Sequence, residues 1–585
     1  MCGIIGILGR GDVAPYLVDG LGRLEYRGYD SAGMAVMEDG AIAVLRTVGT
    51  VERLAAMYRG SPVSGAAGLA HTRWATHGGV SDRNAHPHVS CGGEAAVIHN
   101  GIIENHAELR EELSSKGHAF KSETDTEVAV HLLEEALAAG KGPLEAGMDV
   151  ARRLRGQYAL VFLMRGHPDV ILAMRKNAPL LVGLGKGESI VASDALAFID
   201  RTNRVVFLED DTLALVARDG VRVYGFLGQE RPVVVTDLAQ ELTLPDKHDH
   251  EHFTIKEIRE QPEAVERVVS QVPGSMTIFR RELEKAKRVF FVAAGTSYHA
   301  ALLAKRYFSD HMKLYGEVIL ASEYRGSEQW FDDGAVVVCI SQSGETMDVL
   351  EAARSAKGRG ATVLSMVNRS PSSLEMLSDA VVKLNVGPEV GVAATKSFTA
   401  QVVLFYALAR GGASEEEVAE LKGAMEAALA QEQEIIGVAE LVAKGRDVYF
   451  LGRGVSYPMA LEGALKMKEL AYLHAEGLAA GELKHGPLAL VDSGTPLVLL
   501  NPEDETYAET MSNGAEVKSR GGMVIGFSTA PSPTYDRFVR IPPVRAEFYP
   551  VVEAVPLQLL AYHVARLLDK SIDKPRNLAK SVTVK

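Results

Sequence analysis

The sequence has few cysteines, no long apolar run and no excess of positive charge. Its three cysteines, Cys2, Cys91 and Cys339, lie far apart and form no Cys-x-x-Cys pair, so no disulfide framework or zinc motif is expected and a reducing cytosol fits. No apolar stretch approaches the roughly 20 residues that a membrane span needs. Residues 1–9 lack the basic start of a secretory signal. The net charge of -14 argues against nucleic-acid binding, which needs a basic face. We therefore expect a cytoplasmic protein with no membrane or nucleic-acid partner.

The chain is too long for a single hydrophobic core. Its 585 residues predict about three or four domains of roughly 150 residues each. Apolar residues make up 47% of the chain and charged residues 24%. These values are ordinary for globular proteins and exclude the disordered and fibrous classes.

The first residues, Met1-Cys2-Gly3-Ile4, carry a possible nucleophile. Removal of the initiator methionine would place a thiol and an α-amine on Cys2. Because an α-amine titrates near ~8 and a free thiol near ~8.5, the amine can act as the base for its own nucleophile. The alternative is a plain cysteine at the start of a strand, and the first residues alone do not decide between the two.

The first 239 residues consist mainly of short strand-like runs separated by turn residues. Helical patterns occur at 126–139 and 143–154. This pattern predicts a two-layer sheet structure with flanking helices, and not alternating βα units. The expected strands are 2–8, 33–38, 42–47, 95–99, 159–164, 170–174, 189–192 and 212–216.

Polar clusters interrupt these strands, and each has two interpretations. Asn100-Gly101 lies between apolar runs, which is typical of a hairpin turn, or it supplies an oxyanion hole from one side-chain amide and one backbone N–H. Arg73 and Asp125 would then bind the two ends of an amino acid, its carboxylate and its ammonium. The histidines around His86 lack matching carboxylates, so we expect no metal there.

Five of these segments together resemble the class II glutamine amidotransferase family, which has an N-terminal-nucleophile fold of stacked sheets between helices. They are Cys2–Ile4, Arg27–Ser31, His71–Gly78, His99–Gly101 and Ser122–Asp125. The resemblance implies that Cys2 attacks the glutamine amide and that Asn100 and Gly101 hold the oxyanion. It also implies that four residues bind glutamine and that Trp74 gates the passage of ammonia. The four are Arg73, Thr76, His77 and Asp125.

The second half of the chain repeats itself after a polar, histidine-rich junction at 245–252 that we interpret as a domain boundary. Residues 290–302 resemble residues 449–461, with Gly295 and Ser297 matching Gly454 and Ser456, each 159 positions later. Each copy reads as a strand, a glycine turn and a helix, followed by further βα units. The repeat predicts two doubly wound parallel sheets from an internal duplication. Residues 414–445, with a Ser414/Glu417 capping box, would connect them.

The two copies differ in the loop after the buried strand 336–340. The first has Ser341-Gln342-Ser343-Gly344-Glu345-Thr346, whose hydroxyls and backbone N–H groups at a helix N-terminus suit an anion. Because Walker spacing and its lysine are missing, a sugar monophosphate is favoured over a nucleotide. The second has Asn501-Pro502-Glu503-Asp504-Glu505-Thr506, which would repel phosphate.

The second copy carries a run of charged residues instead. Glu462, Lys466 and Glu469 have i, i+4, i+7 spacing and share one helix face. A solvated, ion-paired stripe explains this spacing, and spacing alone favours that interpretation. Acid–base groups for opening a sugar ring and moving a proton are the alternative.

The segments Gly295–Ser297, Ser341–Thr346, Gly391–Lys396 and Gly481–Pro487 resemble paired sugar-isomerase (SIS) domains, and with the tail at 575–584 the chain resembles the glutamine–fructose-6-phosphate aminotransferase family throughout. The resemblance implies that Lys580 forms a Schiff base with the sugar and that His485 assists ring opening. It implies that Glu469 moves the proton, supported by Glu462 and Lys466. The implied fructose 6-phosphate residues are Thr296, Ser297, Ser341, Gln342, Ser343, Thr346 and Val392.

We therefore predict an enzyme that makes glucosamine 6-phosphate from fructose 6-phosphate and L-glutamine, without metal or organic cofactor, as a homodimer by family resemblance. An amidotransferase with a phosphoribosyl or aspartyl acceptor is disfavoured by the Ser341–Thr346 loop. A sugar-sensing regulator would have no use for residues 1–239. The predicted divisions are a glutaminase domain (1–239), a linker and junction helix (240–279), a first SIS domain (280–419), a helical connection (420–438), a second SIS domain (439–575) and a tail (576–585).

Overall fold

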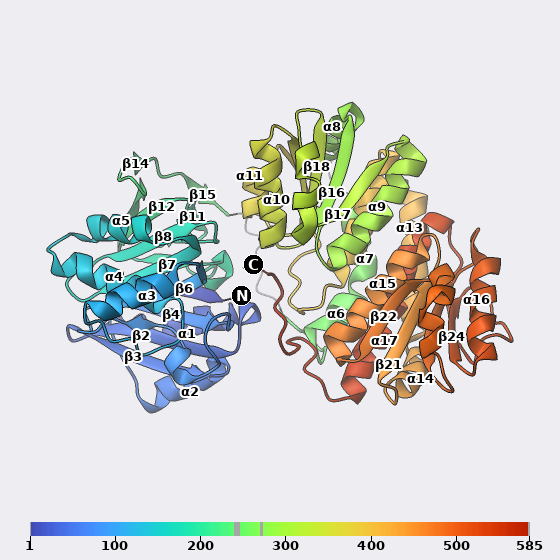
Figure 1. Ribbon diagram of the computed structural model, residues 1–585, viewed down its shortest axis with the longest axis horizontal. Helices are drawn as coiled ribbons and strands as arrows, with labels where there is room; N and C mark the ends of the chain where they lie inside the picture. Colours follow the sequence, from blue (N-terminus) through green and yellow to red (C-terminus); the bar gives the residue numbers. More distant parts are fainter. Residues whose placement is uncertain (1, 239–245, 270–272, 583–585) are drawn as a thin grey trace. The chain divides into compact units, whose positions relative to one another are not determined.

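The computed structural model describes residues 2–238, 246–269 and 273–582. The first part of the predicted linker (240–245) and the end of the predicted tail (583–585) lie outside the described residues. The chain divides into two compact units, one of residues 1–244 with 581–585 and the other of residues 245–580 (Figure 1).

The first unit contains two antiparallel sheets. The eight-stranded sheet has the order β15-β11-β9-β10-β1-β4-β2-β3 and the seven-stranded sheet the order β14-β13-β12-β8-β7-β6-β5. Their strands are β1 (Gly3–Leu8), β2 (Ser31–Glu38), β3 (Ala41–Val48), β4 (Ala67–Arg73), β5 (His88–Val89), β6 (Ala95–Ile103), β7 (Gly156–Met164), β8 (Ile171–Lys176), β9 (Leu181–Leu184), β10 (Ser189–Ala192), β11 (Arg204–Phe207), β12 (Thr212–Ala217), β13 (Gly220–Gly225), β14 (Glu230–Arg231) and β15 (Val235–Asp237).

Helices cover the outer face of each sheet. Helices α1 (Ala14–Gly22) and α2 (Val51–Gly60) pack on the eight-stranded sheet, and α4 (Glu127–Ala138) and α5 (Pro143–Arg153) on the seven-stranded one, with α3 (His106–Ser115) against α4. Alternate strand residues fill the space between the sheets, for example Ile4, Leu69 and Val161. The unit is therefore a four-layer helix–sheet–sheet–helix structure, as its strand pattern predicts.

The second unit contains two five-stranded parallel sheets with the same strand order, β17-β16-β18-β19-β20 and β22-β21-β23-β24-β25. This repeated topology confirms the two doubly wound sheets expected from the duplication. The strands are β16 (Arg288–Ala293), β17 (Gly316–Leu320), β18 (Ala335–Ser341), β19 (Thr362–Val367), β20 (Ala380–Lys383), β21 (Asp447–Gly452), β22 (His474–Ala479), β23 (Pro496–Asn501), β24 (Met523–Ser528) and β25 (Arg537–Arg540).

One hydrophobic cluster runs through both copies of the repeat, from Phe291 in β16 of the first sheet to Phe450 in β21 of the second. Helix α13 begins with the predicted capping box, in which Ser414 and Glu417 bond each other's backbone N–H. No helix in the described ranges combines the length and the apolar character that crossing a bilayer requires. The helices are α6 (Phe253–Arg259), α7 (Gln261–Val269), α8 (Pro273–Lys285), α9 (Thr296–Met312), α10 (Met347–Gly358), α11 (Ser373–Leu377), α12 (Lys396–Arg410), α13 (Glu415–Leu429), α14 (Glu432–Val442), α15 (Ser456–Lys466), α16 (Tyr507–Ser519) and α17 (Tyr549–Leu567).

Candidate active site

Cys2 lies at the start of β1, beside the end of β4. The backbone N–H of Trp74 donates to Cys2 Sγ at 3.1 Å, and the N–H of Gly3 donates to Thr72 Oγ1 at 2.9 Å. Burial raises the pKa of the Cys2 thiol, although the nearby charge of Arg73 opposes the rise. The thiol therefore needs a base before it can act as a nucleophile at neutral pH.

The hairpin interpretation of Asn100-Gly101 is wrong. Strand β6 continues through both residues and pairs with β7, so that Asn100 faces Ala159 and Gly101 faces Tyr158. Gly101 has a φ of 127°, and a Cβ at this position would lie 2.0 Å from the carbonyl oxygen of Gln157. The pairing along the full strand outweighs the local turn preference of the dipeptide, and only glycine fits this backbone.

The side chain of Asn100 is held next to Cys2. Its Nδ2 donates to the carbonyl oxygen of Cys2 at 2.9 Å, and its Oδ1 lies 3.1 Å from His71 Nε2. Burial lowers the pKa of His71 to about 3. His71 Nε2 also faces the carbonyl oxygen of His99 at 2.9 Å. With two acceptors in reach, Nε2 carries the proton and orients the amide. His71 is not among the residues to which the sequence assigned a role.

The charged residues expected to bind glutamine gather around Cys2. Arg73 is buried and donates to the carbonyls of Gly78 and Gly79 at 3.0 and 3.2 Å. Burial lowers the pKa of Arg73. The nearby Cys2 thiol and Asp125 carboxylate oppose this shift without reversing it. Asp125 accepts the N–H of Ile103 at 2.8 Å.

The other residues predicted for the glutamine site, and the predicted gate Trp74, lie on the loop after β4. Thr76 is exposed, whereas His77 and Trp74 are half-buried. The Trp74 ring meets Tyr29 edge-to-face, with 5.9 Å between the ring centroids.

In the second unit, Glu462, Lys466 and Glu469 are not a solvated stripe. The side chain of Lys466 is 0% exposed and that of Glu462 is 1% exposed. Lys466 Nζ lies 2.5 Å from Glu469 Oε2 and 3.4 Å from Glu462 Oε1. Burial lowers the pKa of Lys466, but the charges of Glu469 and Glu462 raise it by more, so the net shift of the pKa is upward. The segment Met467–Ala471 is a π-helical turn, a feature that is frequent at functional sites.

Helix α9 of the first copy completes this network. Thr296 Oγ1 donates to Glu462 at 3.0 Å and accepts from Lys466 Nζ at 3.0 Å. His299 Nδ1 lies 2.7 Å from Glu462 Oε2. The predicted residue Thr296 thus joins the predicted carboxylates, while His299 is an addition that no sequence motif indicated: it follows the shared Ser-Tyr pair, and the second copy has Pro458 at the matching position.

Lys580 lies in the interior next to a carboxylate that the sequence analysis did not single out. Its Nζ is 2.5 Å from Glu389 Oε2 and 2.7 Å from the carbonyl oxygen of Gly391. Glu389 also accepts the N–H and hydroxyl groups of Ser397 at 3.0 and 2.7 Å. The charge of Glu389 raises the pKa of Lys466 as well, so both lysines belong to one electrostatic environment. Nearby, Val392 is buried and bonded to the backbone of Asp573.

The Ser341–Thr346 loop joins β18 to α10. Ser341 Oγ lies 2.8 Å from Thr346 Oγ1 and accepts the N–H of Gly344 at 3.1 Å. Ser343 Oγ accepts the N–H of Glu345 at 3.2 Å. The Nε2 of Gln342 is buried without a hydrogen-bond partner among the described residues. The loop thus concentrates hydroxyl and amide donors at a helix N-terminus, where an anion is favoured. Elsewhere, Ser297 Oγ accepts from Gln401.

The matching loop of the second copy is blocked by its own carboxylate. Asp504 Oδ1 accepts the backbone N–H and the hydroxyl of Thr506 at 2.7 and 2.8 Å. A carboxylate therefore already occupies the start of α16, which agrees with phosphate binding by the first copy alone.

His485 is set apart from the buried network. It is exposed at the end of a short 3₁₀ helix, Ala480–His485. Within the described part of the chain it forms no hydrogen bond or ion pair with the other predicted residues.

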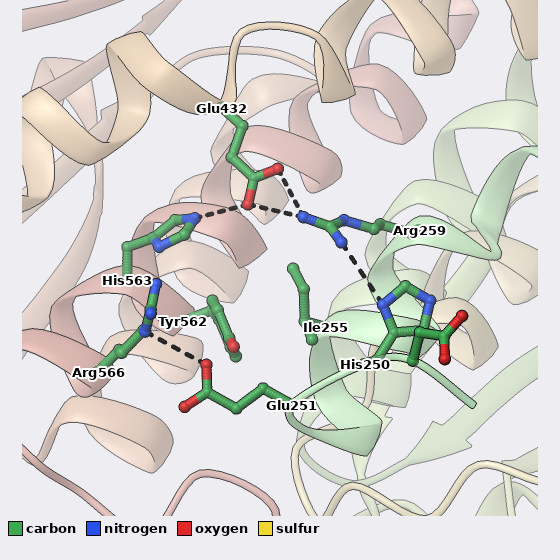
Figure 2. Close-up of a pocket in the computed structure, with 9 residues that line it drawn as sticks. His250, Glu251, Ile255, Arg259, Glu432, Tyr562, His563 and Arg566 are labelled. Carbon is green, nitrogen blue, oxygen red and sulfur yellow. Dashed lines mark hydrogen bonds and ion pairs between the residues drawn. The ribbon is translucent and has the colours of Figure 1, made fainter. Parts of the chain in front are cut away.

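A separate pocket of 130 Å³ lies between α6, α14 and α17. Figure 2 shows Glu432 between Arg259 and His563, which it contacts at 2.9 and 3.0 Å. Its lining contains none of the predicted site residues. Because Glu432 already pairs with Arg259 and His563, we do not assign the sugar chemistry to this pocket.

Comparison with known families and proteins agrees with this geometry. The SIS domain family matches residues 282–410 and 441–568, and a glutamine amidotransferase domain family matches residues 71–200. The chain is 43% identical to the "Glutamine--fructose-6-phosphate aminotransferase [isomerizing]" of Zymomonas mobilis, and 43% identical to that of Thermococcus kodakarensis, over 100% of both chains in each case.

The chain belongs to the glutamine–fructose-6-phosphate aminotransferase family. A solved structure supports this membership. The C-terminal domain of glucosamine-fructose-6-phosphate aminotransferase from Francisella tularensis is 35% identical with a TM-score of 0.52, and the match covers 56% of this chain and 100% of that chain. Family membership confirms the predicted combination of an amidotransferase domain with two SIS domains.

Proposed function

We propose that this chain transfers the amide nitrogen of L-glutamine to fructose 6-phosphate and isomerises the product to glucosamine 6-phosphate, releasing L-glutamate. The observation that carries the proposal is the pair of buried networks, one around Cys2 and one around Lys466 and Lys580. The names of the full-length relatives support the two substrates.

The first half of the reaction would occur at Cys2. Once Met1 is removed, the α-amine takes the thiol proton and Sγ attacks the amide carbon of glutamine. Asn100 Nδ2 already bonds the carbonyl of Cys2, and an amide NH₂ has a second N–H to donate. That N–H and the backbone N–H of Gly101 would hold the oxyanion. Ammonia leaves, and water hydrolyses the thioester to glutamate. Arg73 would bind the glutamine carboxylate and Asp125 its ammonium, with Thr76 and His77 lining the site.

The second half would occur in the SIS pair. The Ser341–Thr346 loop, with Ser297 and Val392, holds fructose 6-phosphate in the proposal, and His485 assists ring opening. Lys580 forms an imine with the C2 carbonyl and expels water; ammonia then displaces the lysine. Glu469 removes a proton from C1 and returns it to C2, with its charge set by Lys466 and Glu462. The 4% exposed Lys580 side chain supports the desolvated amine that imine formation needs.

Family resemblance adds three expectations. Ammonia passes to the sugar through a channel gated by Trp74, the first unit has the N-terminal-nucleophile fold, and the enzyme works as a cytoplasmic homodimer. A dimer would be compatible with the isolated position of His485, which a second copy could bring to the sugar site.

The decisive experiment incubates the purified full-length protein with glutamine and fructose 6-phosphate and measures both products by mass spectrometry. We expect glucosamine 6-phosphate and glutamate in equal amounts. Glutamate without amino sugar would contradict the acceptor, and isomerisation without glutamate would contradict the nitrogen donor.

A further inference from the structure

Four side chains of the first unit converge at a point that the proposed reaction does not use. They are Cys91, from the turn between β5 and β6, His118, from the loop between α3 and α4, and His131 and Glu134, from α4 itself. One donor atom from each lies within 4.8 Å of the other three. We propose that these four residues bind one zinc ion.

The separations match the edges of a tetrahedron. Cys91 Sγ lies 3.7 Å from the Nδ1 atoms of both His118 and His131. Glu134 Oε2 lies 3.2 Å from the same two nitrogens. A tetrahedral zinc ion with bonds of about 2.0 Å to nitrogen and oxygen and about 2.3 Å to sulfur holds such pairs roughly 3.3 and 3.6 Å apart.

Hydrogen bonding alone does not account for this arrangement. Each imidazole Nδ1 has at most one proton, and it faces both the sulfur and the carboxylate. Each Nδ1 therefore makes one hydrogen bond, either by donating to Glu134 or by accepting from the Cys91 thiol, so at least two of the four contacts are left without a proton between them. A single cation satisfies all four contacts. A thiolate and a carboxylate also supply two negative charges, which balance those of Zn²⁺.

The surrounding groups are those expected around metal ligands. The outer nitrogen of His118 lies 3.6 Å from Glu135, and that of His131 lies 3.8 Å from Glu127. Metal-bound histidines usually donate this outer N–H to a carboxylate, and here both carboxylates lie just beyond hydrogen-bond distance. The backbone N–H of Ala119 donates to Cys91 Sγ at 3.3 Å, and Gly92 donates to the other oxygen of Glu134 at 2.9 Å.

The site would be structural. It joins three segments that are separate in the sequence, with four protein ligands and no open position. Its outer residue Glu127 also accepts the backbone N–H groups of Lys121 and Ser122, each at 2.7 Å. These two bonds hold the segment just before Asp125 in the chain. The sequence predicts no metal, because it has no Cys-x-x-Cys pair and the histidines around His86 lack matching carboxylates.

The test measures metal in the full-length protein after incubation with zinc and gel filtration. We expect one zinc per chain in the wild type and in His167→Gln, a histidine of the same unit outside the cluster, and none in Cys91→Ala. The Glu135→Gln variant keeps all four ligands and should bind zinc roughly 10- to 100-fold more weakly. Wild-type protein that retains no zinc, or equal zinc in Cys91→Ala, would overturn the site.

Cobalt identifies the ligand sulfur. Co²⁺-loaded wild type should show thiolate-to-cobalt absorption in the near ultraviolet, which Cys2→Ala retains and Cys91→Ala loses. A band that disappears only in Cys2→Ala would place the metal at the nucleophile and refute the proposal. Thermal melting should also shift upward on adding zinc in the wild type and not in Cys91→Ala.

Discussion

The buried pair of Lys580 and Glu389 allows stability and chemistry to be tested with the same residue. Glu389 is 0% exposed and lies 2.5 Å from Lys580 Nζ. Burial opposes ionisation of Glu389, but the Lys580 charge and the bonds from Ser397 outweigh it and lower the pKa from 4.5 to about 2. At about 1.4 kcal/mol per pH unit, this difference corresponds to roughly 3 kcal/mol of folding stability.

Replacing Lys580 by alanine should remove most of that stabilisation at neutral pH, because it leaves a buried carboxylate without its cation. Lys580→Arg keeps the cation and should keep most of the stability, yet a guanidinium cannot form the imine. We therefore expect Lys580→Ala to lose stability and amino-sugar synthesis, and Lys580→Arg to lose synthesis alone.

Urea unfolding followed by circular dichroism measures the first effect, and borohydride trapping of fructose 6-phosphate on the Lys580 peptide measures the second. The sign of the pH dependence follows from the lowered pKa of Glu389. The stabilisation is complete above pH 4.5 and is lost as pH falls toward 2, so wild type and Lys580→Ala should converge in acid. An alanine variant as stable as the wild type at pH 7 would refute the electrostatic argument. Amino-sugar synthesis by Lys580→Arg would refute the imine.

Three further predictions concern single positions. Cys2→Ala should abolish glutamine hydrolysis but still make glucosamine 6-phosphate from ammonium salts; loss of both activities would contradict separate sites. Gly101→Ala should cost about 1–3 kcal/mol of folding stability through its positive φ alone and abolish glutamine hydrolysis. Gly166→Ala, with open space around it, is the control and should change neither the unfolding free energy nor the glutaminase activity. Burial and the charge of Glu389 raise the pKa of Glu257 to about 8, so the free energy of unfolding should decrease as the pH rises from 4.5 to 8, which melting experiments measure. An equal decrease in Glu257→Gln would contradict this.

The sequence predicted what depends on local pattern and failed where tertiary packing decides. The capping box at Ser414 and Glu417 and the strands predicted from apolar runs appear in the structure as expected, because neighbours along the chain determine them. Asn100-Gly101 looks like a turn locally, but pairing with β7 keeps it extended. A dipeptide cannot report a partner strand some 60 residues away.

Partners of buried charges were the hardest to predict. Glu389 and His299 carry no motif of their own, and they matter because folding brings them to Lys580 and Glu462. The same limit explains why the spacing of Glu462, Lys466 and Glu469 favoured a solvated stripe. Spacing places side chains on one helix face, but only packing determines whether that face meets water or α9.

The duplicated fold shows how two similar domains can come to hold different chemistry. Gly295 and Gly454 have nearly the same φ, 55° and 54°, so the turn that starts each copy is unchanged. In the first copy the loop between β18 and α10 places hydroxyls such as that of Ser341 at the helix N-terminus. In the second copy Asp504 accepts the backbone N–H at the start of α16 that a phosphate would need. The second copy contributes Lys466 and Glu462, which reach Thr296 of the first. The candidate sugar site therefore requires both copies, and neither SIS domain alone should isomerise fructose 6-phosphate.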